Sequence, residues 1–397
     1  MKKQTQPEAP SVITAKEYAA LPPEEREQWR AVHPRHERLP VWCLVCYGIA
    51  AAALIIYLAA RIFPAFADLF NQNVSEIFRR TLAALTGWIP FSLGEALILL
   101  LPVIFGLTVW YAAKYRCDTW RSTWSFVGIL IAVICMLLSM FVFTFATGYH
   151  GATLDQKLGL EQKEVSAQEL YQTALILSEK INEGHENMTY AADGFSVMPY
   201  SITEMNDKLL DAYDAFCADH GFIDNYHSRL KPVMLSELMN YTHITGVYSY
   251  FTGEANIDIA FPDYTIPYTA AHELAHQRGI AREDEANMVA FLVCMESDDP
   301  YIRYCAYLNM YEYVANALYR ADPDLYTEAR STLPADVKGE MSAYSSFFAK
   351  YQHSTAGSVS GAVNDTFLKF QGTEGTASYG MVVDLTVAYY KHLGLVD

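Results

Sequence analysis

One short segment of the chain has the residue types and spacing to hold a metal ion: Ala271-His272-Glu273-Leu274-Ala275-His276. Histidines four residues apart lie on the same face of a helix, so both imidazoles can reach a single ion. Glu273 can then point at a water held by that ion. Zinc lowers the pKa of such a water, and a carboxylate takes its proton as it attacks a polarised carbonyl. The pattern predicts one Zn²⁺ ion bound by His272 and His276, with Glu273 as general base.

The residues around this segment predict the helix that the chemistry requires. Pro267 suits the first turn of a helix and Gly279 suits its end. A catalytic zinc also needs a third protein ligand. Several carboxylates follow just beyond Gly279, in the segment Glu283-Asp284-Glu285-Ala286-Asn287. The alternative interpretation of these carboxylates is an acidic first helical turn, which the helix dipole favours.

A hairpin is expected directly before this helix. Residues 246–252 and 256–261 flank Gly253, and the second run alternates, with Ile257, Ile259 and Phe261 on one face. Glu254 and Asn256 on this hairpin are candidates for substrate binding, with solvated turn residues as the equal alternative. Tyr379 is a candidate donor to a tetrahedral oxyanion, although an ordinary packing role is the simpler interpretation.

The remainder of residues 148–397 has the pattern of a mostly helical domain. Apolar residues recur at helical spacing in five segments, namely 169–181, 205–216, 286–295, 301–319 and 379–393. Pro334 and the Ser/Gly-rich stretch 354–361 are expected to be loops.

Three uncharged apolar stretches, at about 41–60, 96–113 and 122–147, are long enough to cross a bilayer as helices. Between the first two, an amphipathic segment at about 69–85 predicts a helix lying on the outer membrane surface or under the soluble domain. A signal peptide cleaved after Ala65-Phe66-Ala67 is the less favoured alternative for the first stretch, because that stretch is of full spanning length.

Positive charges near the helix ends predict the orientation. Arg35 and its neighbours in the N-terminal tail, and Lys114, Arg116 and Arg121 in the second loop, favour the cytoplasmic side. We therefore expect a multi-pass protein of the cell membrane with a cytoplasmic tail (1–40), a membrane region (41–147) and an extracytoplasmic domain (148–397).

The charge is concentrated in that last domain. It holds 15 Lys/Arg against 35 Asp/Glu, in a chain whose net charge is −17. A phosphate backbone demands a basic surface, so nucleic acid is excluded as a partner.

The acidic segment resembles a motif of the gluzincins, zinc peptidases whose third ligand is a glutamate. In their membrane-bound branch, related to the CAAX prenyl protease and the heat-shock membrane protease, that glutamate opens an ExxAD motif. The resemblance implies that Glu283 is the third ligand, with Glu285 and Glu296 as alternatives, and that Asn287 hydrogen-bonds to one of the ligands and orients it. The chain departs from the motif in having asparagine at its last position.

A closer resemblance is to a bacterial membrane-protein family known as domain of unknown function 3810, which has a zincin-like site. The matching segments lie along most of the chain: Ile89-Pro90-Phe91-Ser92, Lys231-Pro232-Val233, Gly253-Glu254-Ala255-Asn256, HELAHQRGIAREDEAN, Val363-Asn364-Asp365 and Ser378-Tyr379-Gly380.

These observations lead to one expected architecture and two hypotheses of function. The fold is expected to be α+β and mostly helical, with three N-terminal transmembrane helices followed by a zincin-like metallopeptidase domain with a small β-sheet. The first hypothesis is a membrane-anchored zinc metallopeptidase that cleaves peptide or protein substrates near the lipid bilayer. The alternative is a catalytically inactive zincin-like domain that binds partners in envelope signalling or assembly.

Overall fold

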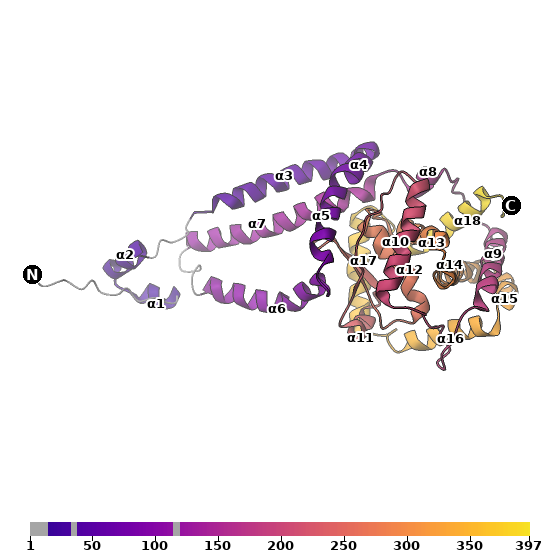
Figure 1. Cartoon of the computed structure of the whole chain (residues 1–397). Helices are drawn as coiled ribbons and strands as arrows, with labels where there is room; N and C mark the ends of the chain where they lie inside the picture. The colour runs from indigo at the N-terminus through magenta and orange to yellow at the C-terminus, as the bar shows by residue number, and fades with distance from the viewer. Residues whose placement is uncertain (1–14, 33–37, 114–119) are drawn as a thin grey trace, which may run out of the picture. The chain divides into compact units, whose positions relative to one another are not determined.

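The computed structural model describes residues 15–32, 38–113 and 120–397 as a mostly helical protein with one small sheet (Figure 1). The chain divides into two compact units, the described parts of Met1–Ile56 with Glu95–Val142, and Tyr57–Gly94 with Phe143–Asp397. The second unit therefore includes residues 57–94 and 143–147, which were expected to be part of the membrane region. The segment from residue 148 onward is not a unit on its own.

Three described helices are long and apolar enough to cross a membrane, as predicted: α3 (Val41–Ile62), α6 (Leu93–Tyr111) and α7 (Trp120–Thr144). They are preceded by α1 (Ala15–Ala20) and α2 (Pro23–Val32). Arg35, Lys114 and Arg116, which carry part of the predicted orientation, lie outside the described residues. The sidedness of these helices stays a prediction.

The second unit begins with the end of α3, and in the sequence it has helices both before and after the strands of the sheet. Its elements up to the sheet are α4 (Pro64–Phe70), η1 (Asn71–Ser75), α5 (Glu76–Gly87), η3 (Ala146–His150), α8 (Leu154–Leu158), α9 (Ala167–His185), α10 (Ile202–Asp219), β1 (Lys231–Pro232), α11 (Ser236–Met239), η4 (Asn240–Thr242), β2 (Gly246–Ser249) and β3 (Glu254–Ile257). The later elements are η5 (Asp263–Thr265), α12 (Ile266–Gln277), α13 (Glu283–Glu296), α14 (Pro300–Ala321), α15 (Pro323–Ser331), α16 (Ala335–Ala349), α17 (Thr355–Phe370), η6 (Gly375–Met381) and α18 (Val382–His392).

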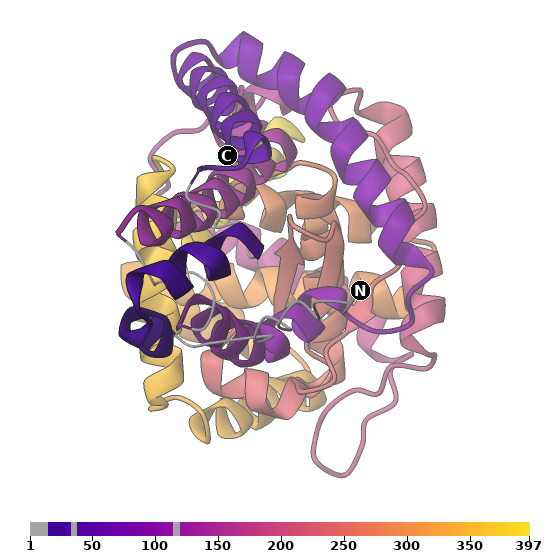
Figure 2. The same cartoon turned by 90° about the vertical axis from the view of Figure 1, so that its left-hand side faces the viewer.

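The sheet, whose strands are drawn as arrows in Figure 2, has the strand order β1-β3-β2, with β1 parallel and β2 antiparallel to β3. The hairpin is thus confirmed, but its second strand ends at Ile257, and the predicted alternation to Phe261 is wrong. All four residues of β3 are buried, because the strand is central and both α12 and α5 pack against it. The strand does alternate in polarity, with Glu254 and Asn256 against Ala255 and Ile257, but its polar side chains are buried as well.

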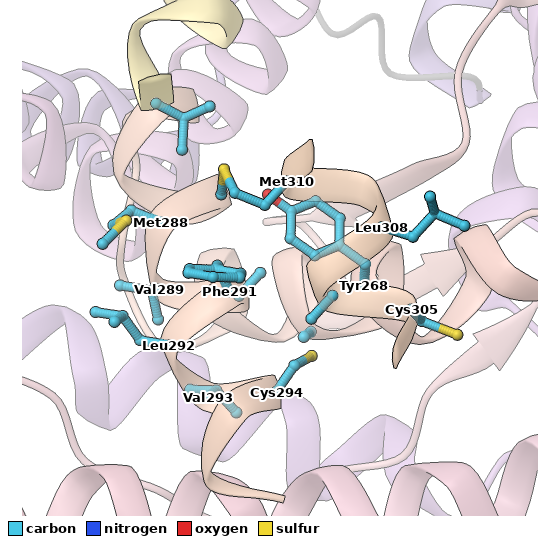
Figure 3. Packing of buried hydrophobic residues seen from close by; sticks show 14 of the residues in the cluster. Tyr268, Met288, Val289, Phe291, Leu292, Val293, Cys294, Cys305, Leu308 and Met310 are labelled. Atoms are coloured by element: carbon cyan, nitrogen blue, oxygen red, sulfur yellow. The ribbon is translucent and has the colours of Figure 1, made fainter. Parts of the chain in front are cut away.

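The core of the unit is built from helices that the periodicity predicted. Apolar side chains of α13 and α14 interdigitate, and Figure 3 shows Tyr268 of α12 among them. Residues 283–294 of α13 are all buried. A helix that is buried on every side lies in the interior of a domain, so α13 is surrounded by its neighbours α10, α12, α14 and α18.

The loop expected at residues 354–361 is wrong, because α17 begins at Thr355. Ser354 caps this helix by accepting a hydrogen bond from the backbone of Gly357 (3.0 Å), as serine commonly does. A side chain at position 357 would overlap the ring of His243. The glycine here permits close packing and does not mark a loop. Pro334, also expected in a loop, is the N-cap residue of α16.

Candidate metal centre

The two histidines lie on α12, whose limits are set by the residues that predicted them. Pro267 stands in its first turn, and the backbone of Gly279 adopts φ +97° just after its end, a conformation that glycine permits. The N–H of Ile280 returns to the carbonyl of Ala275 (3.1 Å). This turn reverses the chain, so that the first residue of α13 lies beside the last turn of α12.

That first residue is Glu283, and one of its carboxylate oxygens faces both histidines. Glu283 Oε2 lies 3.2 Å from His272 Nε2 and 3.3 Å from His276 Nε2. All three residues are buried, and their potential ligand atoms lie within 4.8 Å of one another. The structure therefore brings together the three residues proposed as ligands.

The two alternative third ligands lie elsewhere. Glu285 Oε1 accepts the backbone N–H of Leu154 (3.0 Å) and lies 3.3 Å from Arg282 Nε. Glu296 is exposed at the far end of α13. Neither carboxylate is placed with the imidazoles, so the geometry favours Glu283.

The charges of this cluster are strongly coupled. Burial lowers the pKa of His276, but the Glu283 carboxylate, with smaller contributions from Glu273 and the Ile280 carbonyl, raises it to about 9. Burial raises the pKa of Glu283, but the two imidazoles outweigh it and hold the pKa well below its usual range. In the absence of a metal, the Glu283 carboxylate is therefore the negatively charged partner of the protonated His276 imidazole.

The Nδ1 atoms of the two imidazoles differ in their surroundings. His276 Nδ1 lies 2.7 Å from the carbonyl oxygen of Ile280, an arrangement that leaves Nε2 to Glu283 or to a metal. His272 Nδ1 has no hydrogen-bond partner within the described part of the chain. The orientation of His276 is therefore fixed by the turn after α12, and that of His272 by packing.

Glu273 packs against the start of strand β2 and lies close enough to both histidines and to Glu283 to interact with their charges. A hydrogen bond from the backbone of Tyr248 holds it, and burial raises its pKa above the ordinary value. A Cβ atom at position 246 would lie 2.6 Å from Glu273 Oε1, so only glycine leaves room for the carboxylate. Among the described residues, Glu273 Oε2 has no hydrogen-bond partner, which leaves one oxygen available to accept a proton.

Tyr379 is also brought to the cluster, from η6. Its hydroxyl accepts a hydrogen bond from Asn364 Nδ2 (3.2 Å). Burial and then the nearby Glu283 raise its pKa, so the phenol stays protonated and can donate. Asn287, expected to orient a ligand, instead lies with its Nδ2 3.5 Å from the carbonyl oxygen of Tyr379. This contact is long for a hydrogen bond, and it places the Asn287 amide beside the backbone of Tyr379.

Glu254 and Asn256, the two candidates for substrate binding, are buried within the fold. Glu254 accepts the backbone N–H groups of Leu93 and Gly94 at 3.1 and 2.9 Å. Asn256 donates to the carbonyl oxygen of Val247 (3.0 Å). The structure thus gives these two side chains internal hydrogen bonds that support the sheet and the start of α6.

A buried arginine that the sequence did not single out holds the turn after α12. Arg79 Nη1 donates to Asn71 Oδ1 (2.8 Å) and to the carbonyl oxygen of Thr144 (2.9 Å). Its guanidinium packs against Gly279, where a side chain would overlap it, and Asn71 Nδ2 donates to the Gly279 carbonyl (3.0 Å). Thr144 ends α7, so the cation lies at the negative end of a helix dipole.

Aromatic residues that follow α7 pack beside the candidate metal centre, and the sequence pattern did not indicate them either. The ring of Phe145 meets that of His276 edge-on with centroids 5.7 Å apart. Burial, and then Glu283, raise the pKa of Tyr149. Phe145 lies at the end of the predicted span 122–147 and Tyr149 directly follows that span, so the sequence pattern did not indicate a place for either residue in the site.

The donor set fits zinc. Two imidazole nitrogens and one carboxylate oxygen are ligands typical of a catalytic zinc site. The anchored Nδ1 of His276 is an arrangement that metal-binding histidines almost always have. The residues present are therefore compatible with one zinc ion held by His272, His276 and Glu283.

Comparison with known families agrees with one resemblance seen in the sequence. The family described as protein of unknown function (DUF3810) matches residues 70–387, which is most of the chain. The chain belongs to this family. The matched segment contains the whole ligand set, Arg79 and α17, so the site and its frame are parts of the family's domain. No curated protein and no solved structure matches the chain.

Proposed function

We propose that this chain is a membrane-anchored zinc metallopeptidase that hydrolyses peptide bonds. The observation that carries the proposal is the convergence of His272, His276 and Glu283 within 4.8 Å, with Glu273 on the same helix. The likeness to gluzincins supports it, since that group takes its third ligand from a glutamate on a later helix. The three apolar helices support membrane anchoring.

In this proposal the two imidazoles and the Glu283 carboxylate hold one Zn²⁺ ion. When bound, zinc supplies a Lewis acid that polarises a carbonyl and lowers the pKa of a water. Glu273 accepts the proton of the attacking water through the oxygen that has no partner among the described residues, while the Tyr248 backbone keeps the carboxylate in place. Tyr379, kept protonated by its surroundings, donates to the oxyanion that forms on the carbonyl.

The test uses the full chain, because residues 57–94 belong to the same unit as the site. The wild type and Glu273→Gln are purified in detergent or nanodiscs, their zinc is measured by elemental analysis, and both are incubated with a peptide library. We expect about one zinc in each protein and cleavage only by the wild type, with a loss of about 10²–10⁴-fold in the variant. Cleavage that is unchanged in Glu273→Gln would contradict the proposal.

A second candidate function is supported by the burial of the site. His272, His276 and Glu283 are only 6–8% exposed, whereas a peptidase must admit a chain of several residues. A zincin-like domain that binds partners in envelope signalling or assembly, without hydrolysis, needs no such access. Zinc bound in both proteins with no cleavage by either would favour this candidate.

A further inference from the structure

Helix α5 shows an inverted distribution of polar and apolar residues. Ile77, Leu85 and Trp88 are 62–77% exposed, whereas Arg79 and Thr86 are buried. At 3.6 residues per turn, positions 77, 85 and 88 fall on one side of the helix and positions 79 and 86 on the other. A surface helix of a soluble domain shows the reverse arrangement. We call the side with Ile77, Leu85 and Trp88 the outward face of α5.

Helix α17 presents a second apolar face of this kind. Val359, Val363 and Phe370 are 58–67% exposed and fall on one side, opposite the buried Gly357 and Leu368. The helix has one acidic and one basic residue, and these pair with each other (Lys369 Nζ to Asp365 Oδ2, 2.8 Å). The outward face of α17, formed by Val359, Val363 and Phe370, is thus apolar on a helix without net charge.

The candidate membrane spans meet the second unit next to these helices. At the end of α3, the Tyr57 hydroxyl donates to Gln371 Oε1 (3.2 Å), and Gln371 directly follows α17. At the end of α7, the carbonyl oxygen of Thr144 accepts from Arg79 of α5 (2.9 Å). Both contacts lie within the second unit, so the ends of two spans are fixed beside α17 and α5.

The start of α6 is held in the same way. Lys231 Nζ donates to the carbonyl oxygens of Thr86 (3.0 Å) and Ile89, at the end of α5. The partner of Lys231 is Glu254 at 3.9 Å, which receives the first backbone N–H groups of α6. This buried pair joins the end of α5 to the beginning of a span.

We propose that the outward faces of α5 and α17 rest on the bilayer, in the boundary between lipid headgroups and acyl chains. A bilayer crossed by the three spans must meet the second unit where those spans join it, and both faces adjoin these points. Exposed apolar patches of this kind mark contact surfaces. A tryptophan such as Trp88 suits the membrane–water interface, and a helix without net charge needs no charged partner.

Helix α17 also contacts residues beside the candidate metal centre. The inward side of α17 supplies Asn364, whose Nδ2 donates to the Tyr379 hydroxyl, and Phe367, whose ring lies 6.2 Å from that of Tyr149. One helix therefore touches residues beside the ligand cluster with one side and lipid with the other. The lipid contact itself does not depend on whether the site binds zinc.

The test places a nitroxide label on the full chain in nanodiscs of phosphatidylethanolamine and phosphatidylglycerol. Val363→Cys and Leu85→Cys report on the two outward faces, and Asn316→Cys, exposed on α14, is the matched control. Wild type treated in the same way gives the background from native thiols. Relaxation of the label by oxygen, which partitions into lipid, is compared with relaxation by a water-soluble nickel chelate.

We expect the oxygen-to-nickel ratio to be several-fold higher at positions 363 and 85 than at position 316. Equal ratios at the three positions would mean that the faces meet water, and would overturn the proposal. Exclusion of both reagents would overturn it as well, because a second copy or another protein would then cover the faces. Thermal unfolding verifies each variant, and Val359→Cys and Ile77→Cys replace any variant that does not fold.

Discussion

Two parts of the second unit depart from the usual distribution of side chains, in opposite directions. Where α12 meets α13, imidazole and carboxylate groups are buried among apolar helices. On α5 and α17, large apolar side chains are exposed. Burying ionisable groups costs free energy unless they are paired or bind a metal, and exposing apolar patches costs free energy unless something covers them. The first departure therefore points to chemistry and the second to a contact surface.

The largest effect on the polar side of this comparison is expected from Tyr379→Phe. If its hydroxyl donates to the oxyanion, kcat should fall by about 10²–10³-fold while zinc content stays unchanged. Tyr248→Phe is the control, since the buried Tyr248 hydroxyl has no partner among the described residues. Peptide cleavage assays of the two variants should differ, and equal kcat values would remove Tyr379 from the reaction.

Arg79→Met tests the residue that joins the two regions. The substitution removes the hydrogen bonds from Arg79 to the carbonyl of Thr144 and to the amide oxygen of Asn71. At about 1.5–3 kcal/mol for each hydrogen bond to a charged group, the free energy of unfolding should fall by about 3 kcal/mol. The adjacent Arg80, exposed and paired with Glu76, is the matched control, and Arg80→Met should cost about 0–1 kcal/mol. Similar unfolding midpoints for both variants would show that Arg79 does not support the turn.

Glu312 shows whether a partly buried carboxyl group outside the ligand set changes the stability. Burial raises its pKa to about 7, despite a hydrogen bond from Tyr264. The folded state therefore binds the proton more tightly than the unfolded state, whose pKa is about 4.5. The stability that this difference contributes is complete below the unfolded pKa and is lost as pH rises through 7.

Glu312→Gln should remove this pH dependence. Relative to wild type, the variant should gain roughly 2 kcal/mol between pH 5 and pH 8. Unfolding midpoints of the full chain at several pH values provide the measurement. A difference between the two proteins that does not vary with pH would show that Glu312 titrates normally.

The smallest effect on the reaction rate is expected from a side chain that crowds the Glu273 carboxylate. Gly246→Ala places a methyl group against the Glu273 carboxylate, so kcat/KM should fall by about 10-fold through misplacement, with zinc retained. Gly339→Ala, in α16 with open space around it, is the control and should leave the rate unchanged. An unchanged rate in both variants would mean that Glu273 tolerates displacement.

Much of the fold was predictable because each element carried a local signal. The three spans and the five helical segments were clear from apolar runs and spacing, and Pro267 and Gly279 marked the limits of α12. The β1 strand was not predictable, because two residues carry no period. The serine and glycines of 354–361 were misread since their roles, a helix cap and a close approach to His243, depend on contacts distant in the sequence.

The candidate site was predictable where spacing alone brings residues together. His272, Glu273 and His276 share one helical segment, and Glu283 begins the next helix, directly after the chain reversal at Gly279. Arg79, Asn71 and Phe145 were missed because they come from segments that read as membrane region, and only the tertiary fold brings them to α12. Glu254 was misjudged because a carboxylate on a hairpin suggests an exposed site, whereas here it caps the start of α6.

X-ray absorption spectroscopy of zinc bound to the full chain and to Glu283→Ala tests the ligand set directly. We predict one zinc per wild-type chain with two imidazole nitrogens and further oxygen ligands, and much weaker zinc binding by Glu283→Ala. Sulfur ligands, fewer than two imidazoles, or equal affinity in the two proteins would contradict a site made of His272, His276 and Glu283.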